Sequence, residues 1–501
     1  MGPRAWLALW IGKAAFLALR LLGRGASTLP GRLALRADPA LIADLARRLR
    51  RGAAVVTGTN GKTTTATMLA AGAAADGRRI AHNRTGANLA SGVASALVAA
   101  TGWGGTGRDQ AVAEVDEASM PGVCRGLRPR VAVVTNFFRD QLDRYGELQT
   151  AVALVRRGLA AMPAGGVAVL NADDPLAAGL GETEATAHLR RLYFGVETDL
   201  PDDPGEAPSD AAHCPRCGRP FRYEARYYAH LGRYACDGCG LRRPVPDVAL
   251  VALEEPWGRG GEGAFSAAMA VTADGNGDGA ALARVAAPPG GTARPLAWRL
   301  HLRTPSGPMT FDLAAGGLYN VYNALAAAAG ALALGVAPDT LAGALSAFRS
   351  SFGRMEAVPI DGRTALLALV KNPVGLTEVL RTLARDPDPR KGVLLAINDR
   401  YADGRDVSWL WDADVERLAG VAFGTVVVSG SRAEDMALRL KYAGLDPERV
   451  AVEPDLAAAL RRGIEAVPPG ATLYVLPTYT AMLALRDAIS RRGLARQFWR
   501  V

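Results

Sequence analysis

Two stretches of the sequence combine residue types at spacings that are specific for binding chemistry. The first, residues 57–64, reads TGTNGKTT and follows the short apolar run AAVV. Such a loop between a strand and a helix directs backbone N–H groups, and the positive end of the helix, at phosphate groups. Lys62 would add a full charge at the β- and γ-phosphates of a nucleotide, and the Thr63 hydroxyl is placed to bind Mg²⁺. The full phosphate-loop pattern needs Gly where Val56 stands, so this loop is a shortened variant.

The second stretch holds four of the five cysteines as two CxxC pairs, Cys214 with Cys217 and Cys236 with Cys239. Two such knuckles aim four thiolates at one tetrahedral Zn²⁺, and a closed four-thiolate set predicts a structural rather than a catalytic zinc. A Gly follows the second Cys of each pair, as a tight turn requires. The fifth cysteine, Cys124, is expected to be a buried core thiol.

The elements around these residues alternate between apolar strands and helices. Strands are expected within 53–56, 110–114, 131–134 and 167–170, each followed by a polar loop, and a helix within 318–335. This order predicts a parallel sheet covered by helices on both faces, with ligands at the carboxyl ends of the strands. A second alternation from about Asp361 predicts a smaller α/β domain. We therefore expect an N-terminal helical segment at 1–50, an ATP-binding domain at 51–355 with a zinc-ribbon insertion at 211–243, and a C-terminal α/β domain at 356–501.

Composition and charge narrow the class of protein. The chain has 501 residues, a net charge of +9 and 21% charged residues, as in an ordinary globular protein of two or three domains. Nearly all of its basic residues are Arg, so the mild basicity is weak evidence for nucleic acid, and we expect no nucleic-acid partner. Aromatics between the cysteine pairs are expected to pack the ribbon.

The N-terminus has two open interpretations. The sequence contains no run of about 20 apolar residues, so we expect no transmembrane helix. Residues 6–22 are apolar but are interrupted by Lys13 and Arg20. They read either as one of two packed helices joined by a turn around STLPGR, or as a helix lying on the membrane with Trp6 and Trp10 at the interface. We expect a cytoplasmic protein, and a peripheral contact with the inner face of the membrane stays open.

The loop TGTNGKTTT also resembles the ATP-binding signature of the Mur ligase family, which includes folylpolyglutamate synthase. Glu114 stands where these ligases place a magnesium-binding carboxylate. Further matches follow in the family's order: Asn136, Asp140 and Asp143, then Asn171, Asp173 and Asp174, then Asn320, Asn323 and Arg354. The resemblance implies a Mur-ligase-type fold in which ATP contacts Gly58, Thr59, Asn60, Gly61, Lys62, Thr63, Thr64, Asn171, Asp173, Asn320, Asn323 and Arg354, with Mg²⁺ on Thr63 and Glu114.

Two departures point to one branch of that family. Gln141 replaces the family's His, and no Lys lies between Lys62 and Lys371 to be carbamylated. The inserted ribbon and the strings KNPVG and NDRYADGRDVSWLWD resemble the branch that amidates lipid II. This resemblance implies a heterodimer with a GatD-like glutaminase, whose catalytic triad an Asp of this chain completes. Asp412 is the preferred residue, and Asp406, Asp403 and Asp399 stay open; Trp409 and Trp411 are expected to be buried.

The activity implied by the resemblance is ATP-dependent amidation of the D-glutamate α-carboxylate of lipid II to D-isoglutamine, through an acyl phosphate and with ammonia from the partner. Lys62 and Glu114 would serve the phosphoryl transfer. Two alternatives stay open. One is a Mur- or folylpolyglutamate-type ligase that adds an amino acid without a glutaminase. The other is a zinc-ribbon scaffold that kept a nucleotide fold without catalysis.

Overall fold

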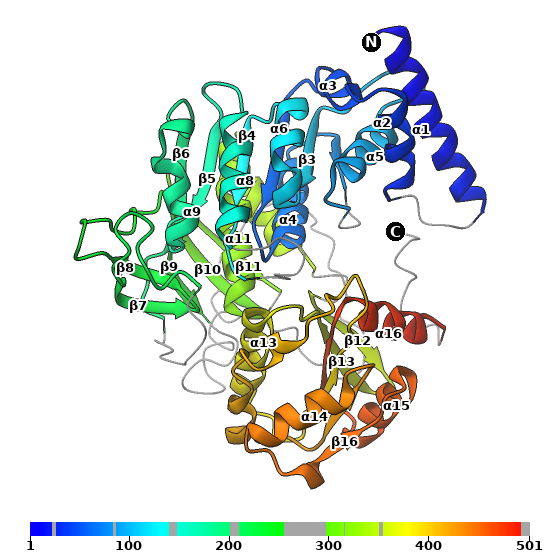
Figure 1. Ribbon diagram of the computed structural model, residues 1–501, viewed down its shortest axis with the longest axis vertical. Helices are drawn as coiled ribbons and strands as arrows, with labels where there is room; N and C mark the ends of the chain where they lie inside the picture. The colour runs from blue at the N-terminus through cyan, green and yellow to red at the C-terminus, as the bar shows by residue number, and fades with distance from the viewer. Residues whose placement is uncertain are drawn as a thin grey trace, which may run out of the picture.

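The computed structural model describes residues 1–22, 27–83, 87–139, 148–200, 210–254, 297–314, 316–349 and 354–491. Within these residues the chain forms two large sheets, one in each half of the molecule (Figure 1). A small two-stranded hairpin carries the CxxC pairs. Asp140, Gln141 and Asp143, which the sequence assigned to a family motif, lie outside the described residues.

The first sheet has nine strands in the order β11-β10-β9-β6-β5-β4-β1-β3-β2. The strands from β6 to β2 are mutually parallel, whereas β10 pairs antiparallel with both of its neighbours. The strands are β1 (Ala53–Thr57), β2 (Ile80–His82), β3 (Gln110–Glu114), β4 (Val131–Val134), β5 (Val167–Asn171), β6 (Arg190–Val196), β9 (Val248–Glu254), β10 (Trp298–Thr304) and β11 (Gly307–Leu313).

Helices cover both faces of this sheet, as the alternation predicts. Along β1, Ala54 and Val56 enter one core with helices α4 (Lys62–Ala75), α11 (Leu318–Ala333) and α12 (Pro338–Ser346). Ala53 and Val55 enter the opposite core with α5 (Ala90–Ala100), α6 (Met120–Leu127) and α8 (Leu148–Ala160). Because both faces are buried, these strands read as continuous apolar runs. The short helix α9 (Pro175–Gly179) follows β5.

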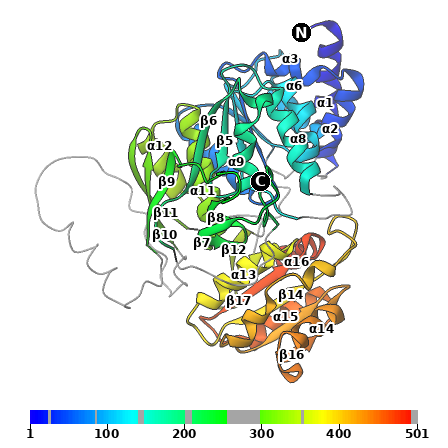
Figure 2. The ribbon, with the colours of Figure 1, turned by 60° about the vertical axis from the view of Figure 1, so that its left-hand side comes forward.

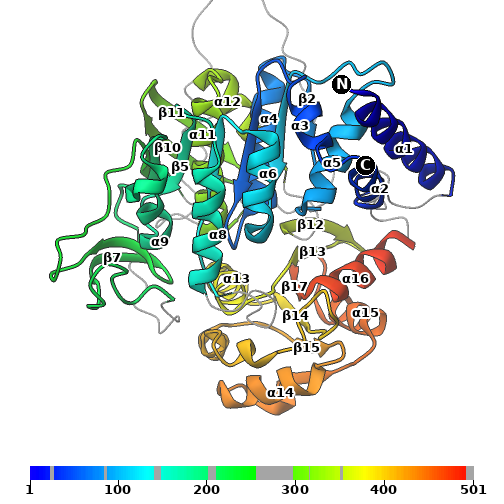
Figure 3. The same cartoon turned by 45° about the horizontal axis from the view of Figure 1, so that its top comes forward.

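The N-terminal segment forms three helices, α1 (Pro3–Leu21), α2 (Leu29–Ala37) and α3 (Leu41–Ala46), at one end of the sheet (Figure 3). The expectation of a turn through STLPGR is wrong in detail, because α2 already begins at Leu29. Pro30 lies in its first turn, where the missing N–H costs no hydrogen bond. No helix within the described residues is long and apolar enough to cross a membrane.

The second sheet has six strands in the order β12-β13-β17-β14-β15-β16, all parallel except for β12. They are β12 (Arg354–Ile360), β13 (Arg363–Ala368), β14 (Gly392–Ala396), β15 (Val426–Ser429), β16 (Val450–Val452) and β17 (Thr472–Pro477). Helices α13 (Pro373–Arg385) and α14 (Ala433–Tyr442) lie on one face, and α15 (Leu456–Ala466) and α16 (Tyr479–Arg491) on the other. The expected boundary at 355/356 falls inside β12, which belongs wholly to this sheet.

The two halves face each other across the phosphate loop. That loop follows β1, whose neighbours β3 and β4 lie on opposite sides of it, so the loop lies where the strand order reverses. The hairpin β7 (Arg222–Tyr228) and β8 (Leu231–Ala235) lies at the β9–β10 side of the first half (Figure 2).

Candidate active site and zinc site

The phosphate loop is held in shape by the segment that follows β4. The Thr59 N–H donates to the Asn136 carbonyl over 2.8 Å, and the Asn60 N–H donates to the Asn136 side-chain oxygen over 2.9 Å. The Thr135 hydroxyl donates to the Asn60 carbonyl over 2.8 Å. The loop is therefore clamped through its backbone, with Asn136 as the principal clamp. This Asn is the described member of the motif whose acids lie outside the described residues.

Two glycines give the loop its path. Gly58 has φ of 118° and Gly61 has φ of 81°, both in the region that favours glycine. A Cβ on Gly61 would lie 1.9 Å from the Asn323 side-chain oxygen of α11. The structure therefore brings Asn323 directly against the loop. Asn320 is buried beside it and accepts a hydrogen bond from the Asn323 amide over 3.2 Å.

The ammonium group of Lys62 is already paired. It lies 3.2 Å from a carboxylate oxygen of Glu117 and donates to the carbonyls of Gly58 and Thr59. Burial raises the pKa of Glu117 above its ordinary value, while the charge of Lys62, and more weakly that of Lys371, lowers it. Sequence reasoning missed Glu117, although a further acid three residues after Glu114 was a visible signal.

Glu114 ends β3 beside Val56, the last strand residue but one before the loop. Its side chain is buried, and one oxygen accepts from the Asn88 amide over 3.4 Å. The other oxygen is buried and has no hydrogen-bond donor in the described part of the chain. A buried carboxylate oxygen without a donor beside a phosphate loop fits a ligand for Mg²⁺, which prefers oxygen ligands.

The motif after β5 serves packing in this structure. Asn171 donates to the Thr135 carbonyl over 2.9 Å, which ties β5 to the loop-clamping segment. Asp173 is fully buried: its oxygens accept from Arg243, from Tyr322 of α11 over 2.7 Å and from the Val196 N–H. A direct contact of Asp173 with a nucleotide would require these bonds to be rearranged, so its assignment to the cofactor stays a prediction.

The second half of the chain reaches the loop through Asn372. Its side-chain amide donates to the Asn60 side-chain oxygen over 3.0 Å, across 312 positions of sequence. Its side-chain oxygen accepts from the Gly375 N–H over 2.8 Å and caps α13. Arg354 begins β12, and its side chain lies outside the described residues. Asn372 thus joins the second half of the molecule to the loop of the first half.

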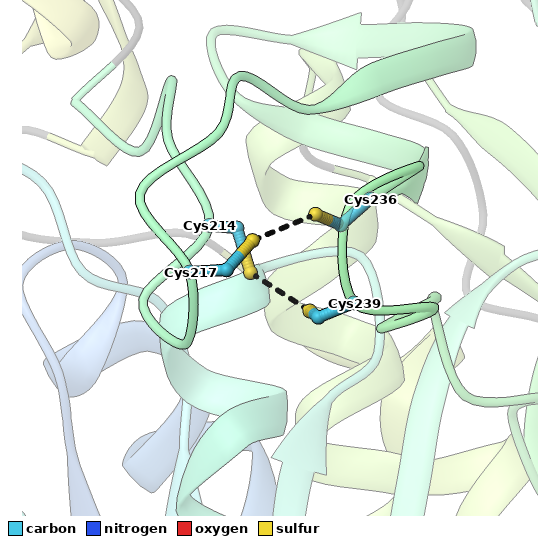
Figure 4. Close-up of side chains that lie close together, drawn as sticks. All are labelled: Cys214, Cys217, Cys236 and Cys239. Atoms are coloured by element: carbon cyan, nitrogen blue, oxygen red, sulfur yellow. Dashed lines mark hydrogen bonds between the residues drawn. The ribbon is translucent and has the colours of Figure 1, made fainter.

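The four cysteines of the CxxC pairs converge, as Figure 4 shows. Their sulfur atoms all lie within 4.8 Å of one another. The two knuckles have the same backbone geometry. The N–H of Gly218 donates to the Cys214 carbonyl, the N–H of Gly240 donates to the Cys236 carbonyl, and both glycines have positive φ. The pKa of Cys236 is lowered to about 7, mainly by a hydrogen bond from the Cys239 backbone N–H. Four convergent thiols with this backbone support fit a structural Zn²⁺.

The aromatics between the pairs pack in the protein core, some of them in the ribbon as expected and the others in the first half. Phe221, Tyr223 and Tyr234 form the small core of the ribbon itself. Tyr227 and Tyr228 at the inner end of the hairpin join the main core of the first half. The Tyr227 carbonyl accepts from Arg381 of α13 over 3.0 Å, so the hairpin also contacts the second half.

The four Asp residues of the loop after β14 differ in exposure and in their partners. Asp403 is buried and accepts from the Thr480 N–H over 2.7 Å, and Asp399 pairs with Arg432. Asp406 and Asp412 are exposed. A carboxylate oxygen of Asp412 lies 4.0 Å from a guanidinium nitrogen of Arg139 in the first half.

The sequence predicts that Trp409, Trp411 and Cys124 are buried. Trp411 is 50% exposed and packs edge-on against Tyr442, so the expected burial is wrong for it. Trp409 packs against the core of the second half. Cys124 is fully buried in the core of the first half, which confirms the expected core thiol, and this burial raises the pKa of the thiol to about 12.

Family models and relatives cover most of the chain. The Mur ligase middle domain matches residues 56–203, and the MurT ligase C-terminal model matches residues 369–482. Lipid II isoglutaminyl synthase (glutamine-hydrolyzing) subunit MurT of Streptococcus pneumoniae is 32% identical over 504 residues, which is 99% of both chains. The subunit of the same name from Staphylococcus aureus is 29% identical over 489 residues, 97% of this chain and 98% of the relative.

Solved structures share the fold. A pseudomurein peptide ligase type C from Methanothermus fervidus superposes with a TM-score of 0.61 at 20% identity, over 88% of this chain and 79% of that one. Folylpolyglutamate synthase of Mycobacterium tuberculosis superposes with a TM-score of 0.58 at 17% identity, over 97% of this chain and 99% of that one.

Proposed function

This chain belongs to the family of MurT subunits of lipid II isoglutaminyl synthase, and on that premise we propose that it is the ATP-dependent ligase that amidates lipid II. The observation that carries the proposal is the match over 99% of the chain to a subunit of that name. The intact Lys62 and Glu114 beside a shaped phosphate loop argue against a scaffold without catalysis.

The proposed reaction has two steps. The α-carboxylate oxygen of D-glutamate in the stem peptide attacks the γ-phosphorus of ATP, so ADP leaves and an acyl phosphate forms. Ammonia then attacks the acyl carbon, the carbon–oxygen bond to phosphate breaks, and a proton is released as D-isoglutamine forms. Lys62 would turn from Glu117 to the phosphates, where its charge offsets the charge that develops during transfer.

The loop Gly58–Thr64, Asn323 and Asn320 would hold the nucleotide, and Arg354 and Asn171 are assigned to it by resemblance. Thr63 and Glu114 would hold Mg²⁺, which neutralises phosphate charge when bound. The four-thiolate site would hold a structural Zn²⁺.

A separate subunit would supply the ammonia, since the family is named as glutamine-hydrolysing and Cys124 is an inert core thiol. We propose a GatD-like glutaminase in a heterodimer. An Asp that orients the partner's His must be reachable from outside this chain. Asp412 and Asp406 meet that requirement, whereas Asp403 is held by Thr480, and Asp412 stays the preferred residue. Because lipid II is membrane-linked, the complex would work at the inner face of the membrane.

The deciding experiment measures phosphate release and amidated lipid II from ATP and lipid II. Three nitrogen sources are compared: ammonium chloride, glutamine alone, and glutamine with the candidate glutaminase. Product with ammonium, none with glutamine alone, and recovery with the glutaminase are expected. Lys62→Ala is the inactive control. Turnover only with an added amino acid would instead support the amino-acid-adding alternative, which no structural observation favours.

A further inference from the structure

The outer face of α1 is apolar although it is turned to solvent. Exposed positions recur at alternating intervals of four and three, which places them on one side of a helix. They are Pro3, Leu7, Trp10, Ala14, Leu17 and Leu21. Leu17 is 54% exposed and Leu21 is 80% exposed. The opposite side is buried against α2 and α5 through small residues such as Ala5, Ala8 and Gly12. The helix is therefore apolar on both sides, but only one side is covered by the described residues.

A second segment continues the same surface. Trp103, in the loop between α5 and β3, is 58% exposed. The indole N–H of Trp10 donates to the Trp103 carbonyl over 3.4 Å, and the Lys13 ammonium lies 5.6 Å from the Trp103 ring centroid. The apolar stripe of α1 and Trp103 thus form one patch, called here the α1 patch. Figures 1 and 3 show α1 at the outer edge of the molecule, away from the second half.

The charged residues of α1 all have one sign. Arg4, Lys13 and Arg20 lie on α1, and the first acidic residue of the chain is Asp38. A second copy of the chain would bring these cations against like charges. A bilayer with anionic headgroups complements them, while Trp and Leu side chains enter the interfacial region. The helix would lie on the bilayer rather than cross it.

We propose that the α1 patch docks this protein on an anionic lipid bilayer. The proposal rests on the proposed function in one respect: a substrate linked to the membrane explains why the ligase should be held there. It assigns to α1 a role beyond packing, because Leu17 and Leu21 are more than half exposed.

The test is flotation of the whole protein with phosphatidylcholine vesicles, with and without phosphatidylglycerol. Wild type should float with the anionic vesicles and bind less as salt is raised. The variant Leu17→Ser/Leu21→Ser should bind about tenfold more weakly, because two exposed apolar side chains are lost. The matched control Leu438→Ser/Val452→Ser removes two side chains that are 47% and 42% exposed on the second half. It should bind as wild type does.

Three outcomes would overturn the proposal. In the first, wild type fails to float with anionic vesicles. In the second, the Leu17/Leu21 variant converts a dimer to a monomer, and in the third it loses only its co-elution with the glutaminase. Amidation of detergent-dissolved lipid II with ammonium serves as the second readout, and the Leu17/Leu21 variant should retain it. If wild type shows no amidation, the proposed function fails, while the flotation result still decides the docking surface.

Discussion

The hydrogen bond between Asn372 and Asn60 offers a sharp test of how the two halves cooperate. The change to Ser at position 372 keeps a side-chain oxygen that caps α13 but is too short to reach Asn60. Only the 3.0 Å bond across the halves is then lost. A neutral hydrogen bond of this kind contributes about 1 kcal/mol, which corresponds to about a fivefold change in an equilibrium constant. We expect KM for ATP to rise about fivefold while the thermal unfolding midpoint stays nearly unchanged.

A double-mutant cycle with Asn60→Ala separates coupling from general damage. The backbone of Asn60, not its side chain, makes the contacts with Asn136, so the loop should keep its shape. Each single variant should raise KM about fivefold, and the double variant should also raise it about fivefold rather than about 25-fold. ATP titrations of ammonium-dependent phosphate release measure all four proteins. Multiplying effects, or no effect of Asn372→Ser, would refute the reasoning.

Three further predictions concern the magnesium site, the acidic loop and the zinc site. Glu114→Gln should lower turnover at least tenfold and raise the Mg²⁺ concentration needed for half-maximal turnover, because a charged metal ligand becomes neutral; an unchanged Mg²⁺ titration would contradict this role. Asp412→Asn should abolish glutamine-dependent amidation and leave ammonium-dependent amidation unchanged, whereas the comparison variant Asp406→Asn should keep both. Loss of glutamine-dependent amidation in Asp406→Asn alone would assign the role to Asp406 instead. Cys236→Ser should remove stoichiometric zinc by metal analysis and lower the unfolding midpoint, since the thiolate set is closed; a zinc-free wild-type protein would refute the site.

The sequence predicts the parts of the site whose chemistry is local. The phosphate loop and the cysteine knuckles each depend on a few consecutive residues, so their backbone geometry follows from residue type. Contacts between residues far apart in the sequence were not predictable in that way. Nothing adjacent to Asn372 indicates that it reaches Asn60, and nothing adjacent to Asp173 indicates that Arg243 and Tyr322 occupy it.

Element boundaries show the same limit. The expected boundary between residues 355 and 356 cuts through β12, which pairs with β13 because strand pairing is decided by tertiary structure. The three residues of β16 are too few to give a periodic signal.

The hairpin that carries the zinc knuckles has a consequence for motion. Its inner end is fixed to the first half through Tyr228, and its Tyr227 carbonyl receives Arg381 from the second half. This contact between the hairpin and α13 would restrain the two halves of the molecule from moving far apart before substrates bind. Small-angle scattering should therefore show little compaction when ATP is added. The conformational entropy needed to bring the two halves together would then be lost once, when the chain folds, and not again in every catalytic cycle.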